Sequence, residues 1–224
     1  MSTISGNITA QIALTGTINI AEKGLSFEKA MAGQAVDFAK ITGPDNDTLG
    51  IIHIKELEVT GFRFLADFAF RDNVILQKLT ANDVVSGGQG AFSGCSNLIE
   101  VNLNGFTGDA AMQMFYGCKK MEIIKIPKVN SIGMQTFYNC NKLASIRLEN
   151  CGSIGNSAFQ YCTVLHDIYL GKNSIVSLSS GAFNGSGIAT DDTARIHVPA
   201  DLASSYKINS NWSAYADKIV GDYA

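Results

Sequence analysis

Histidine, tryptophan and proline are scarce in this chain. Its 224 residues include three histidines, one tryptophan and three prolines, and 17 basic against 20 acidic residues give a net charge of −3. So few histidines, with no clustered carboxylates, argue against most catalytic and metal-dependent chemistry. The slightly acidic balance excludes the basic surface that a nucleic-acid-binding protein needs. We therefore expect no enzyme, no cofactor, no metal site and no nucleic-acid partner.

Long apolar runs are also missing. The apolar stretches cover only a few residues each, whereas a membrane-spanning helix needs about 20, so no transmembrane segment is expected. The N-terminus, Met1 to Asn7, lacks the basic region and apolar core of a secretory signal. Location therefore stays open between the cell surface or secretion and association with a virion.

What the chain does contain is an internal repeat. Six phenylalanines recur at intervals of 22 to 24 residues, namely Phe70, Phe92, Phe115, Phe137, Phe159 and Phe183. Four of them open the pattern Phe-x-x-Cys-x-x-Leu-x-x-Ile-x-Leu, with Met or Val at some apolar positions, as in Phe137 to Leu148. Self-similarity at a fixed period of this length is typical of solenoids.

Each repeat predicts one short strand and several turns. The Ile-x-Leu pair places alternate side chains on one side of a strand. Seven such strands are expected to form one parallel sheet, at residues 57–59, 79–81, 101–103, 124–126, 146–148, 168–170 and 196–198. The three-residue spacings elsewhere predict turns and 3₁₀-like segments. Because one unit cannot bury its apolar side alone, neighbours must stack around a common core with the phenylalanines as its spine.

The five cysteines fit this packing. Four share one repeat position, and Cys151 takes the position that Val129 holds in the preceding repeat; the four are Cys95, Cys118, Cys140 and Cys162. Unpaired cysteine packs as a small hydrophobe. Neither a Cys-x-x-Cys spacing nor paired histidines suggest a zinc or redox site. We expect five reduced, structural thiols.

The repeat resembles the BspA-type leucine-rich repeat. The likeness rests on the Phe-x-x-Cys pattern and on Ile132-Gly133 and Ile154-Gly155, and it covers roughly residues 54 to 198. It implies an α/β repeat solenoid with short parallel strands, used for adhesion and for binding proteins or surfaces. Members of this family are typically bacterial surface or secreted proteins, and some occur in prophage tails.

Two flanking segments complete the expected organisation. Residues 1–50 form an N-terminal β-rich module, 51–194 the repeats, and 195–224 a C-terminal strand and helical cap. Alternation from Ile4 to Ile20 indicates half-buried β-structure, either a cap or an element that assembles a homo-oligomer. In the tail, Leu202 and Tyr206 predict a short helix, and Trp212 is expected to cover the open end of the core.

A candidate binding surface follows from the strand alternation. One outward residue per strand gives a column whose proposed ligand-binding members are Glu58, Asn102, Lys125, Arg147, Tyr169 and His197. The alternative is an ordinary solvated sheet face. A second outward column lies two residues upstream, at Glu56, Lys78, Glu100, Ile123, Ser145, Asp167 and Arg195.

Function is therefore expected to be non-catalytic. The chain would recognise a protein or a cell-surface polymer through its strand face. The alternative is a structural phage or prophage tail or fibre component that assembles through the N-terminal β segment, because Ile4-Ser-Gly-Asn-Ile8 resembles openings of prophage tail proteins. His166 beside Asp167 is the nearest approach to an acid–base pair, and it lacks a nucleophile with a positioned orienter.

Overall fold

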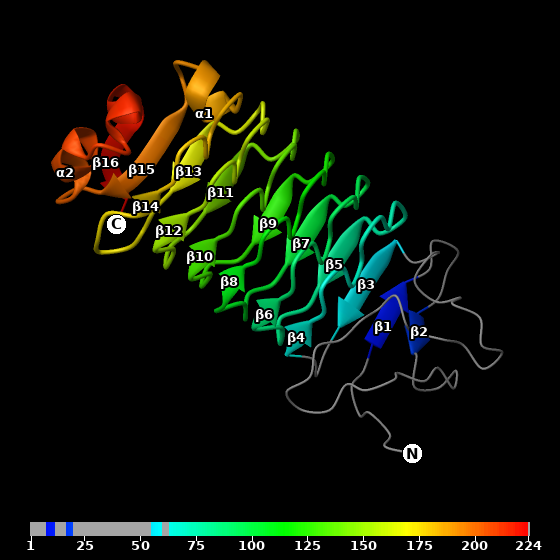
Figure 1. Ribbon diagram of the computed structural model, residues 1–224. Helices are drawn as coiled ribbons and strands as arrows, with labels where there is room; N and C mark the ends of the chain where they lie inside the picture. Colours follow the sequence, from blue (N-terminus) through cyan, green and yellow to red (C-terminus); the bar gives the residue numbers. More distant parts are fainter. Residues whose placement is uncertain (1–7, 12–16, 20–54, 60–62, 224) are drawn as a thin grey trace.

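Each repeat forms one coil of a solenoid with little helix. The computed structural model describes residues 8–11, 17–19, 55–59 and 63–223. In Figure 1 the coils stack along one axis, and each adds a strand to each of two rows. The buried side chains of all coils form one hydrophobic cluster. The predicted repeat solenoid is confirmed.

The first row of strands makes what we call the strand face. Its members are β3 (Glu56–Val59), β5 (Lys78–Thr80), β7 (Glu100–Asn102), β9 (Ile123–Lys125), β11 (Ser145–Arg147), β13 (Asp167–Tyr169) and β15 (Arg195–Pro199). All seven begin one residue before the predicted position. The second residue of each strand points inward, whereas the second apolar residue of the repeat pattern, such as Leu103, is buried at or just after the end of the strand.

The predicted single sheet of seven strands is interrupted. Hydrogen bonds join β3, β5, β7 and β9 in one sheet and β11, β13 and β15 in another. Within the described residues, β9 and β11 are the only successive strands on this face that sheet hydrogen bonds do not connect. The interruption lies at the middle of the repeat array.

A second parallel sheet was not predicted. It consists of the two-residue strands β4 (Phe64–Leu65), β6 (Ser86–Gly87), β8 (Asp109–Ala110), β10 (Ser131–Ile132), β12 (Ser153–Ile154) and β14 (Ser177–Leu178). The expectation of turns at these positions was wrong because stacking supplies partners from neighbouring coils. A strand of two residues is too short to show alternation in the sequence.

The phenylalanine segments form the third side of each coil as tight turns, as predicted. A ladder of backbone hydrogen bonds joins these turns, for example from Phe92 N–H to the Met114 carbonyl at 2.8 Å. The residues two before and two after each phenylalanine have positive φ, as Gly90 and Gly94 do around Phe92. Seven of these residues are not glycine, although the left-handed conformation favours glycine.

The phenylalanine rings form the expected spine. Successive rings from Phe70 to Phe183 are stacked, with centroids 5.0 to 5.6 Å apart and planes within 16° of parallel. The six rings are fully buried or nearly so. Aromatic stacking therefore links every coil of the repeat region to the next.

All five cysteines are free and buried, as expected. Four thiols point to the phenylalanine carbonyl of the preceding coil; the Sγ of Cys118, for example, donates to the Phe92 oxygen at 3.2 Å. Burial raises the pKa of Cys95 to about 12 and that of Cys151 to about 11. These thiols stay protonated inside the core at neutral pH.

Additional strands and short helices lie at the two ends. At the N-terminal end, β1 (Ile8–Gln11) pairs antiparallel with both β2 (Thr17–Asn19) and β3. Gly43 to Asp47, whose glycine, proline and asparagine predict a turn, lies outside the described residues. The C-terminal end contains α1 (Gly187–Thr190), α2 (Ala203–Ile208), the 3₁₀ helix η3 (Ser213–Lys218) and β16 (Ile219–Tyr223), which extends the sheet beside β15.

Trp212 covers the last coil, as predicted. Its indole is fully buried, lies 6.1 Å from the Phe183 ring centroid, and donates through Nε1 to the Val176 carbonyl at 2.7 Å. The Val176 N–H donates to the Tyr206 hydroxyl at 2.8 Å. The backbone N–H and carbonyl of Val176 are therefore both hydrogen-bonded to aromatic side chains of the C-terminal segment.

Candidate functional site

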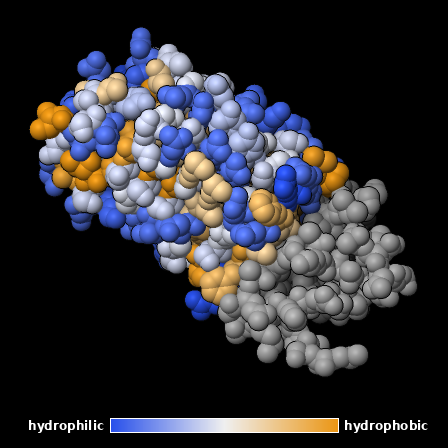
Figure 2. Space-filling model, viewed as in Figure 1, coloured by the Kyte–Doolittle hydropathy of each residue, from blue (hydrophilic) through white to orange (hydrophobic). Residues whose placement is uncertain are grey.

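The strand face carries all six residues that the sequence singled out. They lie at equivalent outward positions of β3, β7, β9, β11, β13 and β15, as Glu58, Asn102, Lys125, Arg147, Tyr169 and His197. Glu58, Lys125 and Arg147 are exposed, whereas Asn102, Tyr169 and His197 are half-buried. In Figure 2, the surface in this view is mainly hydrophilic, with isolated hydrophobic residues.

Three of these residues pack against one another at the C-terminal end. The guanidinium carbon of Arg147 lies 4.1 Å from the Tyr169 ring centroid. On the neighbouring strand, the His197 ring stacks on Tyr169 with centroids 4.2 Å apart and planes 9° from parallel. A partner therefore cannot stack on either face of Tyr169 without displacing a neighbouring side chain.

His197 is also fixed by two carboxylates. Its Nδ1 lies 2.8 Å from Asp222 Oδ1 and its Nε2 lies 3.0 Å from Asp167 Oδ1. A neutral imidazole has one N–H, so only the protonated ring donates to both carboxylates. The histidine side chain is 14% exposed. It thus joins β13, β15 and β16 rather than standing free for a ligand.

The terminal strand was not predicted, and with it two residues of this cluster were missed. The Tyr223 hydroxyl donates to Glu149 at 3.2 Å and receives a hydrogen bond from Arg147 at 3.5 Å. Asp222 binds His197 as described. Ile219, Gly221 and Tyr223 occupy every second position, as residues on one side of a strand do. So short a segment is nevertheless too brief to predict a strand from its sequence.

Toward the N-terminal end the strand face is less occupied by internal contacts. Lys78 and Glu100, in the upstream column, form a cross-strand ion pair of 3.0 Å. Lys125 is exposed, and among the described residues no carboxylate lies within ion-pair distance of its ammonium group. The Oδ1 atom of Asn102, opposite Lys125 in the strand register, is buried without a hydrogen-bond partner.

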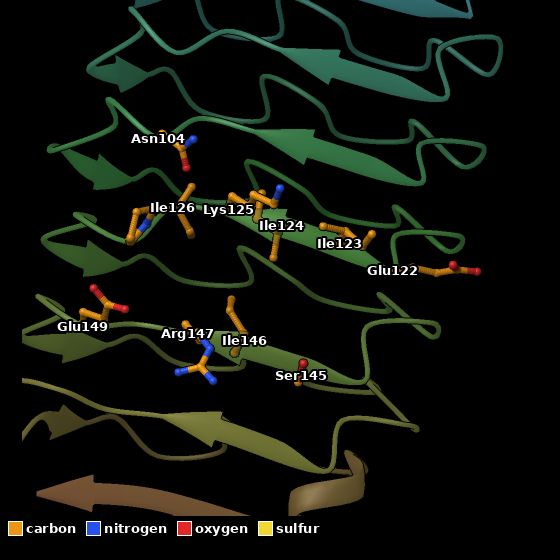
Figure 3. A pocket seen from close by; sticks show the side chains of 11 residues that line it. Asn104, Glu122, Ile123, Ile124, Lys125, Ile126, Ser145, Ile146, Arg147 and Glu149 are labelled. Carbon is orange, nitrogen blue, oxygen red and sulfur yellow. The ribbon is translucent and has the colours of Figure 1, made fainter. Parts of the chain in front are cut away.

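A groove of about 390 Å³ opens where β9 and β11 are unpaired. Figure 3 shows Ile123, Ile124 and Lys125 on one side of it and Ser145 and Ile146 on the other. Ile123 is 44% exposed. Arg147 turns away from β9 toward β13 (Figure 3), in agreement with its position over Tyr169. This groove combines apolar side chains with strand edges that lack backbone partners.

The described residues offer little for catalysis or metal binding. His166 pairs with Asp191 at 3.1 Å rather than with Asp167, its neighbour in the sequence. The pKa of Asp191 is lowered mainly by hydrogen bonds that its carboxylate accepts from Thr193. No group of three or more potential metal ligands occurs in the described part of the chain. Nor does that part contain a helix long and apolar enough to cross a membrane.

Solved structures with the same fold come from several bacteria. The chain is similar to a leucine rich cell surface protein of Faecalibacterium prausnitzii, with 23% identity over 63% of this chain and 38% of that one, and a TM-score of 0.53. A leucine-rich repeat protein of Bacteroides ovatus is 25% identical over 71% of this chain and 41% of that one, with a TM-score of 0.53. A leucine rich repeat protein of T. pallidum is 18% identical over 82% and 95%, with a TM-score of 0.52.

The first two of these proteins are much longer than this chain, which spans 38% and 41% of their lengths. No curated protein matches the sequence. A family model, BspA type leucine rich repeat region in six copies, matches residues 50–130 and 110–196. These ranges contain every coil from β3 to β14, with the phenylalanine spine and the cysteine positions that first indicated the repeat. The chain belongs to the BspA-type leucine-rich repeat family.

Proposed function

We propose that this chain is a non-catalytic binding module that recognises a protein or a cell-surface ligand through its strand face. Leucine-rich repeat proteins are generally non-enzymatic and typically bind proteins. The observation that supports the strand face is the regular outward display on β3 to β15, where every strand contributes side chains of varied charge and polarity. Repeat proteins present extended surfaces of this kind to partners.

The contacts among the outward residues divide the proposed surface into two parts. Arg147, Tyr169 and His197 are engaged with one another and with β16. Glu58 and Lys125 are exposed and carry opposite charges. We therefore assign recognition mainly to the segment from β3 to β11, and a stabilising role to the cluster from β11 to β16.

We also propose that the N-terminal module caps the repeats. The antiparallel pairing of β1 with β3 covers the edge that the first coil would otherwise present. Exposed strand edges promote pairing between chains. With that edge covered, light scattering of the full chain is expected to give the mass of a monomer. A stable higher-order ring would contradict the cap and favour an assembly role for residues 1–50.

The experiment that tests binding is the selection of random twelve-residue peptides, displayed on phage, on the immobilised full chain. Selected peptides should lose most of their affinity for a double variant, Glu58→Lys with Lys125→Glu, which preserves net charge. The matched control, Lys128→Glu with Asp217→Lys, changes exposed residues outside the strand face. Equal binding to both variants, or no enrichment above an unrelated protein, would refute the proposal.

A further inference from the structure

We infer that a cluster of exposed lysines around β9 and β11 is a docking surface for an anionic polysaccharide. We call this surface the basic patch, and its members are Lys119, Lys120, Lys125 and Lys142. The inference rests on the proposed function, because it names the chemistry of the cell-surface ligand. Three observations carry it: the segregation of charge along the chain, the absence of internal ion pairs, and the composition of the neighbouring surface.

Charge is unevenly distributed along this net-acidic chain. Residues 110–148 contain six of the 17 basic residues and one of the 20 acidic residues, which gives this stretch a formal charge of +5. The whole chain carries −3, so the remainder carries −8. The net charge therefore does not describe the surface around β9 and β11. The six cations are Lys119, Lys120, Lys125, Lys128, Lys142 and Arg147, and the acid is Glu122.

The lysines of the basic patch are not neutralised by their own chain. Among the described residues, no carboxylate lies within ion-pair distance of any of the four ammonium groups. Acidic residues on the flanking strands are engaged elsewhere, since Glu100 pairs with Lys78 at 3.0 Å and Asp167 pairs with His197 at 3.0 Å. An anion from outside would therefore meet several available ammonium groups.

The coil repeat aligns these lysines along the solenoid. Lys120 and Lys142 each follow a buried cysteine by two residues, so they hold equivalent positions on adjacent coils. The phenylalanine rings of the two coils are 5.3 Å apart, which gives the step between them. Lys119 precedes Lys120 at the same corner, and Lys125 ends β9. A linear polymer that follows the solenoid axis would thus pass cations on successive coils.

Short polar side chains continue the same row in both directions. The equivalent corner positions hold Ser96 and Asn97 in the coil before, and Thr163 in the coil after. Four coils with strands spaced about 4.8 Å apart give a row of roughly 14 Å. Hydroxyl and amide groups both donate and accept hydrogen bonds, as the hydroxyls of a sugar require. The row therefore combines attraction for an anion with hydrogen bonding to an uncharged sugar backbone.

The composition of the patch favours a polysaccharide over an acidic protein. Protein–protein interfaces have an apolar core and are depleted in lysine. In β9 and β11, Ile123 is the one exposed large apolar side chain, and the lysines around it are exposed. A polyanion needs no apolar core, because neutralisation of its charges by lysine releases bound counterions and drives binding.

The test measures binding of fluorescent carboxymethyl dextran to the full chain by anisotropy, at several salt concentrations. Unmodified dextran of the same length lacks the charge, poly-glutamate carries the same carboxylates on a peptide backbone, and duplex DNA carries phosphates. We expect carboxymethyl dextran to bind at least about tenfold more tightly than any of these three. The logarithm of its association constant should fall linearly with the logarithm of the salt concentration.

Two double variants locate the binding, and circular dichroism checks that each is folded. Lys120→Gln with Lys142→Gln should weaken carboxymethyl dextran at least about tenfold and lower the salt slope by about one to two. The matched control, Lys55→Gln with Lys207→Gln, removes the same charge from exposed positions outside the basic patch. It should leave both quantities close to those of the wild type.

Three results would each overturn the inference. They are tight binding of any of the three comparison polymers, the same loss of affinity in both double variants, and no saturable binding of carboxymethyl dextran. If library-selected peptides still depend on Glu58 and Lys125 in that case, recognition by the strand face stands and only the polysaccharide is refuted. If those peptides are insensitive to the strand face, the proposed function itself fails.

Discussion

Alkaline pH should destabilise this solenoid through its buried thiols, and Cys118 offers the sharpest test. Burial raises the pKa of its thiol well above the ordinary value of 9.0, and the negative charge of an ionised Cys95 would raise it further. The unfolded chain ionises at the ordinary value. Above pH 9 the unfolded state therefore loses a proton that the folded state keeps, so stability falls as pH rises. Below pH 9 this contribution is fully retained.

The magnitude follows from the difference between the two states. Each pH unit above the unfolded pKa costs about 1.4 kcal/mol per thiol until the folded pKa is reached. At pH 10.5 one such thiol lowers the free energy of unfolding by about 2 kcal/mol. Four thiols have raised pKa values, namely Cys95, Cys118, Cys140 and Cys151. All four act in the same direction, so the wild type loses stability between pH 9 and pH 10.5.

The assay is urea unfolding under reducing conditions at pH 8 and pH 10.5, for the wild type, Cys118→Ala and Met121→Ala. Met121 is equally buried and cannot ionise. The free energy of unfolding of Cys118→Ala, taken relative to wild type, should rise by about 2 kcal/mol from pH 8 to pH 10.5. The free energy of unfolding of Met121→Ala relative to wild type should be the same at both pH values. The same difference at both pH values for Cys118→Ala would refute the reasoning, because it would mean that the thiol ionises equally in both states.

Three further outcomes are expected. Phe137→Ala should lower the free energy of unfolding by about 3–5 kcal/mol, measured in urea, because its ring is fully buried between two stacked rings; a loss below about 1 kcal/mol would contradict the spine. Gly117→Ala should cost only about 1–2 kcal/mol, from its positive φ, since no atom lies within 4 Å of the added carbon. Replacing Arg147 and Tyr169 together by alanine should lower the melting temperature, because the pair packs on β15 and β16; an unchanged melting temperature would return these residues to a purely ligand-binding role.

The interior of the coils was the most predictable part of the fold. Phenylalanine and cysteine recur at fixed positions, which Phe115 and Cys118 hold in one coil, because every coil must fill the same space against its neighbours. The outward column was also predictable, because side chains alternate along a strand and the residue after each inward one must point outward. The positive-φ positions were not, because seven of the twelve hold a residue other than glycine, Gln135 and Ser157 among them. There the bonding between coils overrides local preference.

The proposed binding surface was only half predictable. The sequence placed Arg147, Tyr169 and His197 on one face, but it did not indicate that Asp222 and Tyr223 of β16 would bind His197 and Arg147. The interruption between β9 and β11 has no signature at all, because Ile124 and Ile146 keep the repeat pattern on both sides of it. Pairing across a junction depends on backbone separation, which side-chain periodicity does not report.

The break in pairing between β9 and β11 also determines how the molecule responds to force. At that junction the second sheet continues from β10 to β12, and the Phe137 N–H still bonds to the Ala158 carbonyl at 2.8 Å. Two connections out of three remain, both away from the strand face. The repeat array therefore bends most easily at this junction. A load applied to its two ends would separate β9 from β11 on the strand face before it broke the other two sides of the coil.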